Sequence, residues 1–360
     1  MNQDCLKLTT YFAEHDKTGG RFLADALLDC YGRHQFATSV LLRGAEGFGS
    51  RQHLQTQRLL TLSEDLPMVT VAVDTRQRIE QALEEVAALT THGLVTLERA
   101  RMLTGEVGQV RLPEGLAEAT KLTIYVGRGE RVAGRPAFLA IVDLLRRHRI
   151  DGATVLLGVD GTAHGVRQRA RFVGRNADVP LMIISVGAGT AIATALPKLG
   201  AMLDRPLLTL ERVRVCKRDG HKLTEPEPLP NADPAGLGVW QKLMVYAGEE
   251  AQHQGHPLYV QLARRLLQAG AAGATALRGI WGYHGDHEPH GDRLLSLRRK
   301  VPVLTVVVDT PTRIRRWFGI VDELTDETGL VTCEMVPAFH ARGRHGDLRL
   351  STLSAGEALD

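Results

Sequence analysis

The stretch LLRGAEGFGSRQ (Leu41–Gln52) ends an apolar run in three closely spaced glycines, and a polar segment follows them. Similar stretches occur twice more, as LLGVDGTAHG (156–165) and LRGIWGYHG (277–285). In each stretch the first glycine lies 37 residues after a lysine, and the pairs are Lys7 and Gly44, Lys121 and Gly158, and Lys242 and Gly279. This constant spacing indicates that one structural unit is repeated three times along the chain.

Three further segments recur in the same order around each glycine cluster. The lysine begins KLTTY (7–11), KLTIY (121–125) or KLMVY (242–246). After the cluster come DLPMVTVAVD (65–74), DVPLMIISVG (178–187) and KVPVLTVVVD (300–309), each with proline at its third position. The copies end in LVTLE (94–98), LLTLE (207–211) and LVTCE (330–334). We therefore predict three domains, at residues 1–112, 119–220 and 238–345, of which the second is degenerate.

Each copy has the pattern of a β-α-β-β-α-β unit. An alternating stretch begins it, and a segment such as RPAFLAIVDLLRRH (135–148), with apolar residues at intervals of three and four, predicts a helix. An apolar strand such as ATVLLG (153–158) follows, and the next strand begins at the proline, where a missing N–H is tolerated. The segment DTRQRIEQALEEVAAL (74–89) predicts a second helix with Asp74 or Thr75 as N-cap, and a short strand closes the unit. This order is that of the ferredoxin-like motif, so we predict an α+β fold.

The composition excludes several classes of protein. Apolar residues make up 44% of the chain and charged residues 24%, as in soluble globular proteins, and the net charge of +3 is too small for a nucleic-acid footprint. No apolar run reaches the roughly 18 residues needed to span a bilayer, and the first residues lack the pattern of a secretory signal. We expect a cytoplasmic protein with no nucleic-acid partner and no membrane insertion. The cysteines are scattered without a CxxC pair, which argues against a disulfide framework or a zinc site: Cys5, Cys30, Cys216 and Cys333.

The glycine cluster and the strand after it resemble a known family. The segment GFGSRQ (47–52), followed by DLPMVTVAVD, resembles the PII-type nitrogen-regulatory proteins, and the whole pattern is closer still to the PII-like family that carries a domain-of-unknown-function label. The resemblance covers about 100 residues of each copy. It implies trimers of ferredoxin-like units that bind small effectors, usually adenine nucleotides, in the clefts between subunits. Three units in one chain then imply an intrachain pseudo-trimer, since tethering raises the effective concentration of neighbouring units.

The glycine loops of copies one and three are the first candidate ligand sites. Glycine lets the backbone adopt positive φ and lets a ligand approach main-chain N–H groups, which can hold an anion. The alternative is a tight bend between strand and loop with no ligand. The candidate residues are Arg43, Gly44, Gly47, Gly49, Arg51 and Gln52 in copy one, and Arg278, Gly279, Gly282 and Gly285 in copy three.

Arginines after the last strand of copies one and two are a second candidate. Arg99 and Arg101, and likewise Arg212 and Arg214, resemble the arginine pair that reaches a neighbour's nucleotide in PII proteins. Two arginines two residues apart on a strand project to one face, which suits an anionic ligand, although a solvated strand edge guarded by charge has the same pattern. The basic residue that follows Leu-Pro in PII proteins is replaced by Met68, Leu181 and Val303, so ATP in its usual pose is not expected. The cofactor is unknown, with an adenine nucleotide as one candidate.

We predict a signal-transduction protein whose small anionic effector binds between repeats while mobile loops engage a regulated protein, a transporter or an enzyme. The sequence has no nucleophile elbow, P-loop or HExxH motif, so we do not expect an enzyme. The alternative is a metal-binding or scaffold module, because His284, His287 and His290 lie three residues apart. The recurring lysines are expected to be strand-face charges or to pair between copies; they are Lys7, Lys121 and Lys242.

Overall fold

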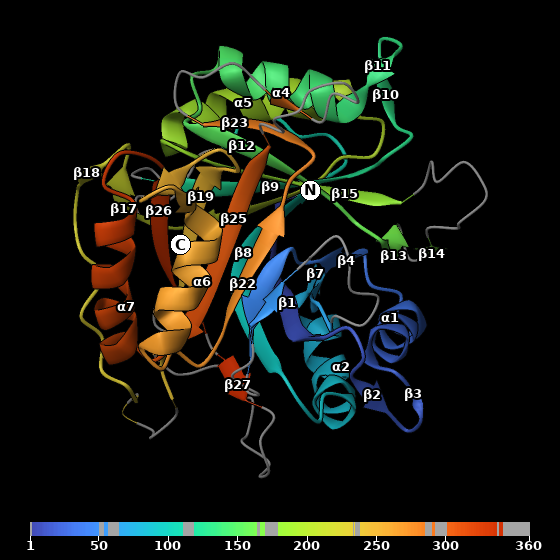
Figure 1. Cartoon of the computed structure of the whole chain (residues 1–360). Coiled ribbons are helices and arrows are strands. Elements are labelled where there is room, and N and C mark those ends of the chain that lie inside the picture. The colour runs from blue at the N-terminus through green and yellow to red at the C-terminus, as the bar shows by residue number, and fades with distance from the viewer. Residues whose placement is uncertain are drawn as a thin grey trace.

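Each repeat contributes four antiparallel strands with two helices against one face of them (Figure 1), and pairings between repeats join these strands into larger sheets. The computed structural model describes residues 2–49, 54–56, 65–110, 119–163, 166–169, 179–232, 234, 238–284, 290–291, 301–336 and 338–340. Repeat 1 consists of β1 (Asn2–Ala13), α1 (Leu23–Arg33), β4 (Thr38–Arg43), β7 (Pro67–Thr75), α2 (Arg76–Leu89) and β8 (Leu94–Thr104). Its strands lie in the order β8-β1-β7-β4. The first strand of the repeat therefore lies between its last and its third strand.

Repeats 2 and 3 have the same order of elements and strands, β16-β9-β15-β12 and β26-β19-β25-β22. Repeat 2 consists of β9 (Thr120–Gly127), α4 (Ala137–Arg147), β12 (Gly152–Leu157), β15 (Pro180–Gly187), α5 (Gly189–Met202) and β16 (Leu207–Arg212). Repeat 3 consists of β19 (Trp240–Gly248), α6 (Leu258–Gln268), β22 (Ala274–Arg278), β25 (Pro302–Asp309), α7 (Pro311–Leu324) and β26 (Leu330–Val336). The described part of the chain thus has the α+β character and the three-fold repetition that the sequence predicts.

Shorter strands extend these sheets. Small hairpins precede the first helix of each repeat: β2 (Lys17–Thr18) with β3 (Arg21–Phe22), β10 (Arg131–Val132) with β11 (Arg135–Pro136), and β20 (Gln252–His253) with β21 (His256–Pro257). The glycine stretches form β5 (Glu46–Phe48) with β6 (Gln55–Thr56), β13 (Asp160–Ala163) with β14 (Val166–Arg169), and β23 (Trp281–His284) with β24 (His290–Gly291). The remaining strands are β17 (Arg214–Arg218), β18 (His221–Lys222) and β27 (Ala338–His340).

The local signals in the sequence account for how several elements begin. The side chain of Thr75 caps α2 and accepts a hydrogen bond from the Arg78 N–H at 3.4 Å, so Thr75 is the N-cap. Pro311 is the first residue of α7, where its fixed φ suits a helix and no N–H is needed. The third strand of each repeat begins at the proline that recurs in all three copies, and these residues are Pro67, Pro180 and Pro302.

The last strand of each repeat continues onto the sheet of the next repeat. The end of β8 pairs with β16, with Leu103 opposite Leu208. After β16, β17 pairs with β26 of repeat 3. After β26, β27 returns to pair with β8, with Phe339 opposite Val95. These three pairings run from repeat 1 to 2, from 2 to 3 and from 3 back to 1, so they close into a ring.

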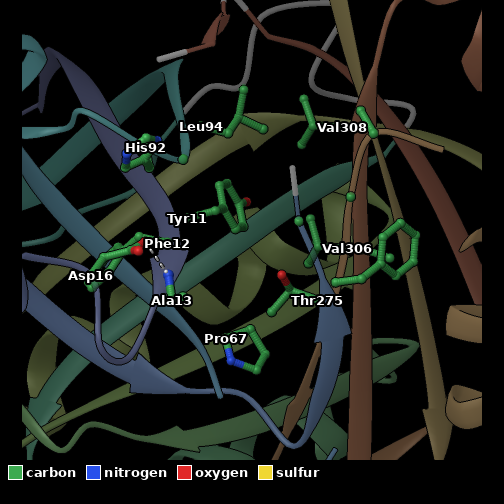
Figure 2. A pocket seen from close by; sticks show the side chains of 16 residues that line it. Tyr11, Phe12, Ala13, Asp16, Pro67, His92, Leu94, Thr275, Val306 and Val308 are labelled. Atoms are coloured by element: carbon green, nitrogen blue, oxygen red, sulfur yellow. Dashed lines mark hydrogen bonds between the residues drawn. The ribbon is translucent and has the colours of Figure 1, made fainter. Parts of the chain in front are cut away.

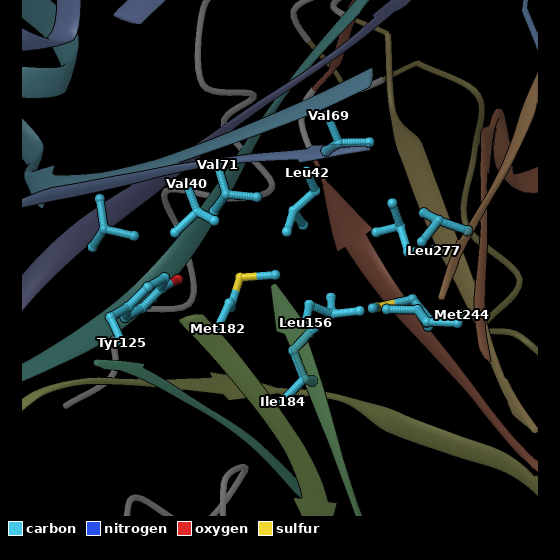
Figure 3. Close-up of a cluster of buried hydrophobic side chains, with 14 of the residues drawn as sticks. Val40, Leu42, Val69, Val71, Tyr125, Leu156, Met182, Ile184, Met244 and Leu277 are labelled. Carbon is cyan, nitrogen blue, oxygen red and sulfur yellow. The ribbon is translucent and has the colours of Figure 1, made fainter. Parts of the chain in front are cut away.

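The glycine stretches form a second closed set of pairings that runs the other way. Strand β13 of repeat 2 pairs with β4 of repeat 1, β23 of repeat 3 pairs with β12 of repeat 2, and β5 of repeat 1 pairs with β22 of repeat 3. An apolar core with side chains from all three repeats lies inside these pairings. Figure 3 shows Val71, Met182 and Leu277 meeting there, one from each repeat.

This second set of pairings explains why the glycines cluster. A Cβ added at Gly47 would lie 2.6 Å from the carbonyl oxygen of Ala274 on β22 of repeat 3. One at Gly158 would lie 2.6 Å from the Pro180 carbonyl oxygen of its own repeat and 2.9 Å from a side-chain carbon of Val40 in repeat 1. At Gly161 and Gly282 an added Cβ would likewise collide with a backbone carbonyl of the neighbouring repeat. Where these strands cross from one repeat to the next, the two backbones lie so close together that Cα can carry only a hydrogen atom and no side chain. The structure therefore gives these glycines a packing role; whether they also contact a ligand stays a prediction.

The stretch KRDGHKLTEPEPLPNADPAGLG (217–238) is rich in proline, glycine and charge, which predicts a solvated linker between repeats 2 and 3, but it begins with ordered strands. Its first residues belong to β17 and β18, and Lys217 is only 3% exposed. The Lys217 ammonium donates to Asp322 of α7 twice, to the main-chain oxygen at 2.7 Å and to the carboxylate at 2.6 Å. The open edge of β26 supplies partners for this backbone, and the end of a helix attracts the cation.

A methyl group at the crossing should destabilise the protein. We expect Gly47→Ala to lower the free energy of unfolding by about 1–3 kcal/mol, because its Cβ would overlap the backbone of β22. Gly49→Ala is the matched control two residues away, since nothing lies within 4 Å of its added Cβ, and we expect a change of at most about 1 kcal/mol. Urea unfolding of both variants measures the difference, and equal effects would contradict the packing role.

Candidate functional site

A ring of six buried charges lies where the three repeats meet. Each repeat contributes one lysine from its first strand and one glutamate from its last strand. These side chains are between 1% and 8% exposed. The six residues, called the charge ring below, are Lys7, Lys121, Lys242, Glu98, Glu211 and Glu334.

Lysines and glutamates alternate around the charge ring. Between repeats, the ammonium–carboxylate distances are 2.5 Å for Lys7–Glu211, 2.6 Å for Lys121–Glu334 and 2.6 Å for Lys242–Glu98. Within repeats they are 2.5 Å for Lys7–Glu98, 2.8 Å for Lys121–Glu211 and 3.4 Å for Lys242–Glu334. Of the two interpretations of the recurring lysines, charges on a strand face or pairs between copies, the structure shows the pairs between copies. The glutamates were missed, although each recurs at the end of its LVTLE-type segment.

Coulombic attraction keeps most of these groups charged despite burial. Burial alone would raise the pKa of Glu98, but Lys242 and Lys7 hold that pKa well below its usual value. Burial would lower the pKa of Lys7, yet Glu211 and Glu98 raise it well above its usual value. At Lys242 the effect of burial prevails and its pKa is lowered. The equal numbers of lysines and glutamates make the ring neutral as a whole.

A small central cavity of about 40 Å³ adjoins the charge ring. Polar groups of the charge ring and of Thr123 line it together with apolar residues such as Met182 and Leu304. Its size suits water rather than an organic ligand. The pockets with room for an organic ligand lie at the seams between repeats.

One seam pocket lies between repeats 1 and 3 and has a cavity volume of about 100 Å³. Figure 2 shows Tyr11 and Leu94 of repeat 1 on one side and Thr275, Val306 and Val308 of repeat 3 on the other. Its lining is mainly apolar. This pocket is called the 1/3 pocket below.

The corresponding pocket between repeats 3 and 2, called the 2/3 pocket, is larger, at about 230 Å³. Tyr246 and Thr154 occupy the places that Tyr11 and Thr275 take in the 1/3 pocket. It adds several polar or aromatic groups, namely Asp151, Arg218, Asp219, Tyr283 and His284. The two pockets are therefore equivalent in position and different in chemistry.

Arg218, the cation that lines the 2/3 pocket, pairs with a carboxylate that lines the same pocket. The Arg218 guanidinium donates to the Asp151 carboxylate at 2.6 Å, and the Tyr283 hydroxyl donates to the Ile150 carbonyl at 2.9 Å. Burial raises the pKa of Asp151, although Arg218 acts to lower it. A cation and a carboxyl group thus lie side by side in a pocket with two tyrosines, an arrangement that can bind an anion and a hydrogen-bond donor of one ligand.

The structure places the predicted glycine-loop residues in different settings. Gly49 lines the 1/3 pocket, and the other described glycines lie at the strand crossings. Arg43 and Arg278 occupy equivalent positions and pair with carboxylates of their own repeats, Glu14 at 2.8 Å and Glu249 at 2.7 Å. Arg51, Gln52 and Gly285 lie outside the described residues.

Three of the predicted arginines lie on the last strands of their repeats, β8 and β16, and Arg214 begins β17. Arg99 and Arg101 are half-buried on the face of β8 opposite to Glu98, so alternation directs them away from the charge ring. Arg212 is exposed, and Arg214 pairs with Glu227 at 3.5 Å. None of these four lines a seam pocket described above. Sequence reasoning missed Arg218, which lies in the stretch expected to be a linker.

The histidine stretch is described in part. His284 lines the 2/3 pocket, whereas His287 lies outside the described residues and the side chain of His290 is not among those described. The metal-binding alternative built on the three histidines therefore stays a prediction.

Comparison with known proteins gives matches that coincide with the three repeats. The family model DUF190 (Uncharacterized ACR, COG1993) matches residues 5–102, 119–215 and 240–338. A UPF0166 protein of Aquifex aeolicus (strain VF5) is 30% identical over 99 residues, which cover 27% of this chain and 91% of the relative. That relative thus corresponds to a single repeat. Among the described residues, none of the helices combines the length and the apolar character that crossing a membrane requires.

Removing one charge from the charge ring should destabilise the folded protein. We expect Glu98→Gln to lower the free energy of unfolding by about 3–5 kcal/mol, because it leaves Lys7 and Lys242 buried with too few carboxylates. Asp143→Asn is the control, since it removes a carboxylate that pairs with Arg135 at 3.0 Å on the surface, and we expect an effect below about 1 kcal/mol. Urea unfolding at pH 7 compares them. Comparable losses would show that the charge ring does not hold the repeats together.

The effect of Glu98→Gln should also depend on pH. The pKa of Glu98 is lowered from 4.5, so its ionised form contributes stability above that pH, and the contribution is lost as the pH falls through the folded-state value. Below pH 4.5 the unfolded wild type binds a proton that the folded protein does not, and the variant lacks this group. The difference in unfolding free energy between wild type and Glu98→Gln should therefore be larger at pH 7 than at pH 3. The same difference at both pH values would contradict this prediction.

Proposed function

Because the chain belongs to the DUF190 family, which is PII-like, we propose that it is a PII-like regulatory protein that binds a small effector at the seams between its repeats. Membership of the family confirms the resemblance drawn from the repeated residues. In this proposal three ferredoxin-like (βαββαβ) repeats form an intrachain pseudo-trimer. Regulation by effector binding, rather than catalysis, is the role that we assign to it.

Two observations support the pseudo-trimer. The strand order is the same in all three repeats, with the first strand between the last and the third. Both sets of strand pairings between repeats return to their starting repeat, and the charge ring joins all three first strands at the centre. A linear array of domains would have no pairing between repeats 3 and 1.

The position of Arg218 is the single observation that favours the 2/3 pocket as the effector site. It brings a guanidinium from the extension of repeat 2 into a pocket that also has Tyr246 and Tyr283. An anionic group of the effector would take the guanidinium from Asp151, and the freed carboxyl group would accept a hydrogen bond from the same ligand. Adenine nucleotides have phosphates, an aromatic base and an amino group, and so they are the first candidates.

The strand that lines the 2/3 pocket precedes the stretch that we assign to partner binding. Strand β23 supplies Tyr283 and His284 to the 2/3 pocket and leads directly into residues 285–300. A ligand that contacts β23 differently in two arrangements of this stretch would shift their populations. The partner in this proposal is a regulated protein, a transporter or an enzyme.

A ligand screen tests the proposal. Thermal unfolding of the full chain is measured with adenine nucleotides, cyclic nucleotides and bicarbonate, since a ligand that binds the folded state raises the Tm. We expect Arg218→Gln to reduce the affinity of the active compound by about tenfold or more through loss of a charge-assisted hydrogen bond. Arg135→Gln is the control, because Arg135 pairs with Asp143 on the surface away from the pocket residues.

Equivalent substitutions separate the two seams. Thr154→Leu fills the 2/3 pocket and Thr275→Leu fills the 1/3 pocket at the same position. The proposal predicts that Thr154→Leu abolishes the Tm shift while Thr275→Leu retains it. A screen without any shift, or a shift that survives both Arg218→Gln and Thr154→Leu, would overturn the effector site.

A further inference from the structure

Three side chains of types that bind metals come together on the helices of repeat 1, and none of them lines the 1/3 pocket or the 2/3 pocket. Cys30 is in α1, His34 is the C-cap residue of α1, and Glu85 is in α2. The thiol sulfur, an imidazole nitrogen and a carboxylate oxygen all lie within 4.8 Å of one another. His34 Nε2 and Glu85 Oε2 are 3.0 Å apart.

Helix geometry explains the convergence. Cys30 and His34 are four residues apart, so they lie on the same face of α1 one turn apart. Helix α2 packs beside α1 (Figure 1) and presents Glu85 to this face. Cys30 is fully buried, whereas the side chains of His34 and Glu85 are 26% and 37% exposed. The cluster therefore has a closed inner end and an outer end open to solvent.

We propose that Cys30, His34 and Glu85 bind a divalent metal ion of the zinc class, with water at the fourth position. Sulfur, nitrogen and oxygen donors together suit a borderline-soft ion such as Zn²⁺ and not Mg²⁺ or Ca²⁺. Three protein ligands with one open position form a tetrahedral site that remains accessible. The Cys30 thiol releases its proton to solvent as the metal–sulfur bond forms, so the ligand set carries two negative charges.

The groups around the cluster are compatible with this role. The Arg33 guanidinium pairs with Glu85 Oε1, which leaves Oε2 directed at His34. Burial, and then Glu85, raise the pKa of the Cys30 thiol to about 12, so the metal-free thiol is protonated. A metal ion would replace that proton and the hydrogen bond between His34 and Glu85, while Arg33 keeps its oxygen.

The other two repeats provide an internal comparison. At the equivalent positions repeat 2 has Leu144, His148 and Lys198, and the Lys198 ammonium lies 3.3 Å from His148 Nε2. Repeat 3 has Arg265, Ala269 and Ile320 there. The same helix pair thus forms with a leucine and a lysine, or with an arginine and an isoleucine, so packing alone does not require a cysteine, a histidine and a glutamate in repeat 1.

Cobalt titration of the full chain tests the site. The protein is stripped with a chelator, dialysed and titrated with Co²⁺, which gives a thiolate-to-cobalt charge-transfer band when sulfur is a ligand. We expect one equivalent of Co²⁺ to produce the band and Zn²⁺ to abolish it by displacement. Cys30→Ser should remove the band, and Glu85→Gln and His34→Ala should each weaken binding by about tenfold or more.

Control variants show whether the charge-transfer band comes from the proposed site or from other histidines and thiols. His148→Ala changes the equivalent histidine of repeat 2, Cys333→Ser removes a buried thiol elsewhere, and His287→Ala alters the histidine stretch; all three should retain the band. Glu85→Gln, at a partly exposed position, keeps the test valid if Cys30→Ser fails to fold, and circular dichroism of the metal-free variants checks the fold. A wild type without the band, or a band that persists in Cys30→Ser, overturns the proposal.

Discussion

The structure depends on the charge ring, in which buried lysines and glutamates alternate around the place where the repeats meet. Burying a charge is costly unless it is paired, and here each lysine contacts a glutamate of its own repeat and one of another repeat. A repeat on its own would leave a lysine and a glutamate with half of their partners. The closed ring, in which every lysine has a carboxylate partner in its own repeat and another in a neighbouring repeat, exists only when all three repeats are present. The ring therefore specifies how the repeats meet, while the apolar side chains around it contribute most of the burial.

The seam pockets follow from the way strands are exchanged around this centre. Each glycine stretch leaves its own repeat and pairs with the neighbour's second strand, and each last strand continues to the other neighbour. The walls of a seam pocket therefore come from two repeats, as Tyr246 and Thr154 illustrate. In the proposed function, an effector bound there would contact both repeats at once, and its affinity would depend on how the repeats pack against each other.

The sequence predicts the elements well because their signals are local. Thr75 as N-cap and the prolines at the third strands depend only on neighbouring residues, and the equal spacing of three copies makes each signal visible three times. The role of Gly47 could not be predicted, because it depends on the carbonyl of Ala274, more than 200 residues away. Arg218 was missed because charge and turn residues in its stretch suggest a linker, whereas the open edge of β26 makes it a strand. The approach of Glu85 to Cys30 depends on the packing of two helices, which spacing alone does not provide.

Covalent connection of the repeats has a consequence for how this protein can evolve and respond. Where identical subunits assemble, every seam must share one set of residues, and the assembly dissociates when its concentration falls. In this chain Arg218 occurs at one seam and its counterparts at the others are Thr104 and His340, so one interface can change without altering the rest. The ring of repeats is also held by peptide bonds, so dilution cannot take it apart. In the proposed function, the ligand affinity of such a chain would not depend on an assembly equilibrium between subunits, and so not on how much of the protein the cell contains.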